Sequence, residues 1–179
     1  MKTFAFALLL VASSSLAAAD HTVVVLRPDF LELVPQARYH IEVRSEYTIF
    51  NPAVQADPAS AEKDSSRRRF PAPEVATLDF TSDTAAGVKP LVFHIPSDVP
   101  APGQGLAAAI EFSVRLQITP PAGSPLPPVL NEGHYLMRPA TGTVTRCLRL
   151  RGPDVGDGIL FIGVSDCERP LPARPVETH

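Results

Sequence analysis

The sequence predicts an all-β protein, an immunoglobulin-like antiparallel β-sandwich of about 7–9 strands. Two segments, Arg38–Phe50 and Ile110–Thr119, alternate between apolar and polar residues, which is the period of a half-buried strand. Proline accounts for 20 of the 179 residues, about twice the average usage. Because proline interrupts helices and central strands, this composition favours short strands joined by stiff loops.

The start of the chain predicts a secretory signal peptide. One positive charge at Lys2 precedes an apolar run from Phe4 to Ala12, and small residues then lead to Ala19 before Asp20. The apolar run is about half as long as a membrane-spanning helix needs to be. We therefore expect cleavage after Ala19 and a secreted, extracellular protein with no transmembrane segment.

The remaining length indicates one domain. About 160 residues would follow the signal peptide, and as a prior that is a single domain. We expect residues 1–19 to be the signal peptide, residues 20–169 the β-sandwich domain, and residues 170–179 a flexible C-terminal tail. The formal net charge of −3 at pH 7 gives no general electrostatic footprint for nucleic acid. We expect no nucleic-acid partner and no cofactor.

The two alternating segments also predict the core. In Arg38–Phe50 the odd-numbered residues form the apolar face, and in Ile110–Thr119 the even-numbered residues do. Residues of one parity share one face of a strand, so these should pack between the sheets. The predicted core is Tyr39, Ile41, Val43, Tyr47, Ile49, Phe112, Val114, Leu116 and Ile118.

Shorter strand patterns fill the rest of the chain. They are rich in β-branched and apolar residues and lie between proline, glycine and asparagine turn signals. In chain order they are Thr22–Leu26, Phe30–Val34, Val75–Phe80, Leu91–Ile95, Tyr135–Arg138, Thr143–Leu150 and Ile159–Val164. Two stretches between them are typical of exposed loops, the charged segment Ala53–Arg69 and the proline-rich segment Pro120–Pro128.

The two cysteines, Cys147 and Cys167, are predicted to form a disulfide, which is the default in a secreted protein. Their separation suits two neighbouring late strands joined by a hairpin through Pro153–Gly158. A reactive thiol or a pair of metal ligands is the alternative interpretation of the same two residues.

Arg67, Arg68 and Arg69 are the candidate binding residues. They form the densest positive cluster of an acidic chain and end the predicted loop Ala53–Arg69. The planar guanidinium pairs well with carboxylates and phosphates, so the cluster is a candidate surface for an acidic partner. A solvated loop without a partner is the alternative. Arg146, Arg149 and Arg151 form a second, smaller basic strip, either solvent-facing or an anion-binding patch.

His21 is the candidate metal ligand. A histidine at the very N-terminus can chelate copper through its amino group and ring, as in the histidine brace of lytic polysaccharide monooxygenases. Cleavage after Asp20 would be needed to expose it, and Ala19 is the better cleavage site. His40, His94 and His134 are candidates for the second ligand. We name no catalytic residue.

The function predicted first is that of a secreted binding or interaction protein of unknown ligand. The reason is a well-formed scaffold without a convincing catalytic set, and the partner would be an extracellular protein or a glycan. Three alternatives stay open: a structural component of the cell surface or matrix, a copper-dependent histidine-brace oxidative enzyme, and a carrier of an apolar ligand. We expect the protein to be a monomer.

Overall fold

The computed structural model describes residues 22–55, 67–95, 102–140, 142–152 and 161–169. The strands are β1 (Thr22–Leu31), β2 (Arg38–Phe50), β3 (Arg68–Thr81), β4 (Leu91–Ile95), β5 (Ala107–Thr119), β6 (Val129–Met137), β7 (Gly142–Arg151) and β8 (Phe161–Ser165). The two described helical segments are α1 (Pro52–Gln55) and the 3₁₀ turn η1 (Ser82–Gly87), and neither is long enough to cross a membrane. His21 and the expected signal peptide and tail lie outside the described residues.

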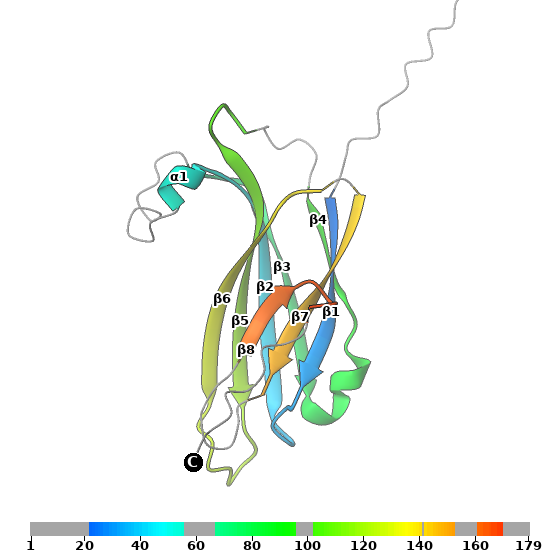
Figure 1. The fold of residues 1–179 in the computed structure, drawn as a ribbon. Helices are drawn as coiled ribbons and strands as arrows, with labels where there is room; N and C mark the ends of the chain where they lie inside the picture. Colours follow the sequence, from blue (N-terminus) through cyan, green and yellow to red (C-terminus); the bar gives the residue numbers. More distant parts are fainter. Residues whose placement is uncertain (1–21, 56–66, 96–101, 141, 153–160, 170–179) are drawn as a thin grey trace, which may run out of the picture.

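The strands form two four-stranded sheets, ordered β4-β1-β7-β8 and β3-β2-β5-β6, that pack against each other (Figure 1). All strand pairs are antiparallel except β1 with β7, which is parallel. The predicted all-β sandwich is therefore confirmed at the level of strand content and layers.

The core lies between the sheets and contains every residue predicted for it. Those nine residues are each at most 7% exposed. The β4-β1-β7-β8 sheet contributes Val24, Leu26, Phe93, Leu148 and Leu150, all at 0% exposure. Phe30, Phe80 and Tyr39 stack in series at one end, with ring centroids 4.9 and 5.1 Å apart. Burial of so many large apolar side chains is the main stabilisation available to the fold.

The first strand differs from its prediction. Phe30–Val34 is not a separate strand, because β1 continues through Pro28 to Leu31. The pairing of β4 with β1 ends at Leu26, so β1 has no partner on its β4 side at Pro28. Proline is tolerated at such an edge position of a strand. The chain turns after β1, with left-handed backbone at Glu32 (φ 51°) and Gln36 (φ 56°).

Several other strands are longer than the sequence predicted, and β3 and β6 differ most. β3 begins at Arg68, inside the segment expected to be a loop, and α1 occupies part of that same segment. β6 begins at Val129 rather than at Tyr135. Its outward face departs from the usual polar pattern, because Leu130 and Leu136 are 70% and 53% exposed, while the inward-facing Asn131 is less exposed than either.

Side-chain hydrogen bonds link the two sheets at both lateral edges of the sandwich. On one side, the Tyr135 hydroxyl of β6 donates a hydrogen bond to the Ile162 carbonyl of β8. Its ring lies over Gly133, where an added Cβ would sit 2.6 Å from the hydroxyl oxygen. On the other side, the His94 N–H of β4 donates to Glu74 Oε2 of β3 at 2.8 Å. The two sheets are thus joined by hydrogen bonds as well as by the core.

The segment after β8 is fixed to the outer face of β7. Cys147 and Cys167 form the predicted disulfide, with Cα atoms 5.0 Å apart. Arg149 lies beside it, with its side chain 5% exposed, and donates to the carbonyls of Cys167 (2.6 Å) and Arg169. Its Nε lies 3.0 Å from Asp29 Oδ2 on the neighbouring strand β1. One covalent bond and one buried cation therefore hold this segment.

The first prediction concerns Tyr135. The variant Tyr135→Phe should lower the free energy of unfolding by about 1 kcal/mol, because the Ile162 carbonyl loses its donor.

Burial raises the pKa of Tyr39 and of Tyr135 above 10.0. The neutral phenol is thus favoured in the folded state, so stability should be complete below pH 10 and fall as the pH rises above it. Urea unfolding between about pH 7 and pH 11 measures both effects, and a wild-type stability that stays flat over that range would contradict the second.

The second prediction concerns the disulfide. The double variant Cys147→Ser/Cys167→Ser should unfold at lower urea, with a loss of about 3 kcal/mol for a closed loop of this length. It should still fold, because Arg149 also holds the segment. Alkylation of the native wild type before reduction should label neither cysteine. Labelling of both, or unchanged stability of the double variant, would contradict the prediction.

Candidate functional site

The outer face of the β3-β2-β5-β6 sheet presents the polar half of both alternating strands. The antiparallel register places Glu42 opposite Arg115 and Arg44 opposite Ser113. The next strand, β6, adds His134 opposite Ser113. Because one face of β2 and β5 must be apolar to build the core, the other face collects these side chains in ordered rows.

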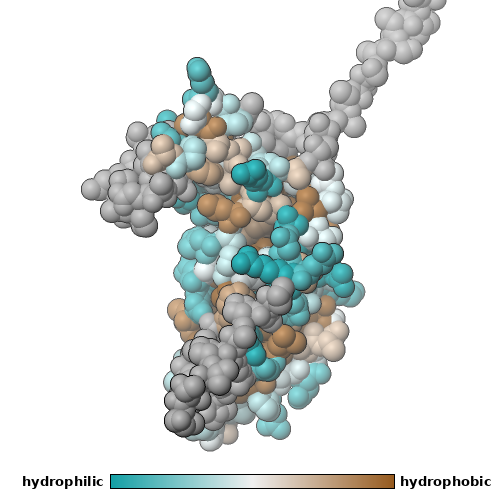
Figure 2. All heavy atoms as spheres, in the orientation of Figure 1, coloured by the Kyte–Doolittle hydropathy of each residue, from teal (hydrophilic) through white to brown (hydrophobic). Residues whose placement is uncertain are grey.

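A shallow depression lies in this face. Its volume is about 240 Å³, and we call it the polar depression. It is lined only by polar or charged residues: Glu42, Arg44, Glu46, Arg69, Ser113, Arg115, Glu132 and His134. On the face visible in Figure 2, by contrast, hydrophobic and hydrophilic residues are interspersed. The lining offers both hydrogen-bond donors and carboxylate acceptors to a ligand.

The arginines that line the polar depression differ in whether they have an ion-pair partner. Arg69 Nε lies 3.1 Å from Glu46 Oε2, and Arg115 Nη2 lies 3.8 Å from Glu132 Oε2. Arg44 is exposed, and among the described residues it has neither an ion pair nor a side-chain hydrogen bond. Its guanidinium is therefore the cation of this surface that is most available to an incoming anion.

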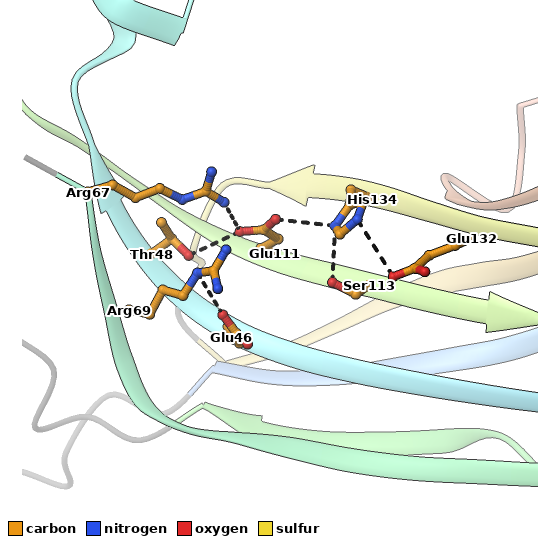
Figure 3. Close-up of polar contacts among 8 residues, drawn as sticks. All are labelled: Glu46, Thr48, Arg67, Arg69, Glu111, Ser113, Glu132 and His134. Carbon is orange, nitrogen blue, oxygen red and sulfur yellow. Dashed lines mark hydrogen bonds and ion pairs between the residues drawn. The ribbon is translucent and has the colours of Figure 1, made fainter. Parts of the chain in front are cut away.

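A buried carboxylate lies at one end of the same face. The Glu111 side chain is 8% exposed and forms an ion pair with Arg67, whose side chain is 27% exposed. Thr48 Oγ1 donates to the same Glu111 oxygen at 3.4 Å, and His134 Nδ1 lies 3.4 Å from the other oxygen. Figure 3 shows Arg67 and His134 approaching Glu111 from opposite sides. This arrangement compensates the cost of burying the carboxylate.

The three arginines predicted as a binding cluster are separated by the structure. Arg67 is engaged with Glu111, whereas Arg69 lines the polar depression and pairs with Glu46. Arg68 is exposed, and its Nη1 donates to the Arg67 carbonyl at 3.1 Å. Only one of the three therefore contributes to the depression. The alternation predicts that Arg44 lies on the polar face of its strand, but it does not distinguish Arg44 from the other polar residues there.

Ser113, His134 and Glu111 do not form a hydrolytic triad. Ser113 Oγ and Glu111 Oε1 both face the same ring nitrogen, Nδ1, at 3.1 and 3.4 Å. A proton relay needs the hydroxyl and the carboxylate on different ring nitrogens. Glu132 Oε1 faces Nε2 but at 3.9 Å, which is too long for a hydrogen bond. The geometry therefore does not support a Ser–His–Glu relay at these three residues.

The described residues hold no group of three or more side chains suited to bind a metal ion. His21, the predicted copper ligand, lies outside them. His40 Nδ1 is 2.8 Å from Asp79 Oδ1. His94 is exposed on β4 and His134 belongs to the polar depression.

The basic strip on β7 is neither a free patch nor fully solvent-facing. Arg146 pairs with Asp166 at 3.1 Å, and Arg151 pairs with Glu32 through two contacts of 2.9 and 3.1 Å. Arg149 is buried with Asp29, as described above. Each of the three guanidinium groups thus already has a carboxylate partner within the chain, which disfavours the alternative of an anion-binding patch.

A second, larger opening lies at the end of the sandwich, next to the aromatic stack. It has a volume of about 650 Å³, and its walls combine apolar residues such as Phe30, Leu33 and Val88 with the carboxylates of Glu32 and Asp83. Glu32 is already paired with Arg151. An apolar ligand would find partial shelter there, but an acidic rim surrounds it.

Comparison with known proteins leaves the chain without a family assignment: no family model, curated protein or solved structure matches it.

The third prediction tests the role of Arg67. The variant Arg67→Ala should lower the free energy of unfolding by about 2 kcal/mol, because Glu111 would stay buried without its cation. The matched variant Arg68→Ala removes an exposed arginine and should change stability by less than about 0.5 kcal/mol. Equal losses in urea unfolding would show that the Arg67–Glu111 contact is not structural.

Proposed function

We propose that this protein is a secreted recognition module and that the polar depression binds a partner carrying exposed carboxylate or sulfate groups. The single observation that carries the proposal is Arg44, an exposed guanidinium among polar neighbours with no ion-pair partner among the described residues. Glu42 and Glu46 flank it on the same strand face. A partner with alternating charge would therefore fit better than a uniform polyanion.

The compartment and the finer fold assignment belong to the same proposal. The signal-peptide pattern in residues 1–19 supports secretion, and so does the disulfide. Two face-to-face sheets with mostly antiparallel pairing support an immunoglobulin-like domain. In such domains recognition surfaces form on rigid strands or on the loops that they support.

The fourth prediction uses two immobilised probes, heparin for an acidic glycan and polyglutamate for an acidic protein. The wild-type protein should bind at least one of them at low salt and dissociate as salt rises, because exposed charges are screened over about 10 Å at 0.1 M. The net charge of −3 opposes non-specific attraction to either polymer. The variant Arg44→Gln should weaken binding about tenfold, the value of one charge-assisted hydrogen bond.

The matched control is Arg38→Gln, which removes an exposed arginine from the same face of β2 but outside the polar depression. It should leave binding within about twofold of wild type. Biolayer interferometry measures all three proteins. Equal affinity of the wild type and Arg44→Gln would place the contact elsewhere, and no binding to either probe would reject an acidic partner.

A further inference from the structure

Three of the four strands at sheet edges carry features that oppose pairing with another chain. β4 and β8 have only five residues each, and the His94 N–H of β4 is already bonded to Glu74. β3 contains Pro71 and Pro73, which have no N–H to offer, and its pairing with β2 shifts register between Ser45 and Tyr47. Short strands, prolines and bulges are recognised protections of sheet edges.

The fourth edge strand, β6, lacks these protections. It runs for nine residues without proline or lysine, and its pairing with β5 is continuous from Val129 to Met137. Figure 1 shows β6 at the left margin of its sheet, and none of the described strands lies beyond it in the strand order. A long regular edge strand of this kind is a template for pairing with another strand.

The exposed side chains of β6 are symmetric about Gly133. Leu130 and Leu136 lie three residues to either side of it and are 70% and 53% exposed. Glu132 and His134 lie one residue to either side, with side chains 49% and 59% exposed. An antiparallel strand of the same sequence, centred on Gly133, would place leucine opposite leucine and glutamate opposite histidine.

We propose that two copies of this chain associate through β6, antiparallel and with Gly133 on the two-fold axis. In that register Leu130 faces Leu136 of the second copy, and Glu132 faces its His134. Each favourable pair occurs twice, as an isologous interface requires. Gly133 carries no side chain at this central position, where an added Cβ would meet Tyr135 of the same chain.

The result is a continuous eight-stranded sheet built from two four-stranded ones. Its outer face carries both polar depressions, because Glu132 and His134 line the depression of each copy at the β6 side. The association does not depend on the proposed function, since Arg44 lies on β2, which β5 separates from β6. It replaces the expectation of a monomer.

Sedimentation velocity of the full chain, from low micromolar to about 300 µM, is the test. The wild type should shift from monomer to dimer with concentration. Leu130→Lys or Leu136→Lys should raise the dissociation constant about tenfold or more, because each places two lysines against leucines across the axis. The matched control is Val92→Lys on β4, where the native valine is 43% exposed, and it should dimerise like the wild type.

A charge exchange tests the register itself. Glu132→Lys and His134→Glu should each weaken the dimer, because like or unpaired charges then meet across the axis. The double variant carrying both changes should restore it, because the introduced lysine would then face the introduced glutamate of the second copy. Wild-type protein that stays monomeric at the highest concentration overturns the proposal. A dimer that is insensitive to both leucine variants, or a double variant weaker than either single one, overturns it as well.

Discussion

The register of β2 on β5 is the constraint on which the rest of the molecule depends. The two strands pair without interruption from Arg38 opposite Thr119 to Phe50 opposite Ala107. A slip of one residue would turn Ile41 toward water and Glu42 into the core, and would do the same along the whole strand. The hydrophobic core and the polar depression are therefore two faces of one pairing, and neither could be altered without the other.

The sequence predicts the elements in which burial and period agree. In β2 and β5 one face meets the opposite sheet and the other meets water, so alternation is visible in the residues themselves. The same argument does not predict β6, because Leu130 and Leu136 are exposed to solvent and Gly133 is covered by the ring of Tyr135. The contact between Tyr135 and Gly133 depends on the folded strand, so local periodicity could not predict it.

The candidate site was predictable only in part for a related reason. Alternation placed Glu46 and Arg44 on a polar face, and the structure confirms that face. It could not show that Arg67 reaches Glu111, 44 residues away, or that Arg149 is enclosed by carbonyls from the chain after β8. The clustering of positive charge in the sequence indicated Arg67–Arg69 as the binding residues. Whether an arginine is available to a partner, however, depends on which carboxylates lie next to it in the folded chain.

Ion pairing also separates structural charge from recognition charge within this one face. Removing Arg67 would leave the buried carboxylate of Glu111 without a cation and would destabilise the fold, so Arg67 is a structural charge. An exposed pair such as Arg115 with Glu132 contributes little and can exchange partners. Glu132 is of the second kind, and it lies with the exposed side chain of His134 on the unprotected strand. Glu132 can therefore exchange its contact with Arg115 for an equivalent contact across the edge at small cost, which is the property that an interface between two folded copies requires.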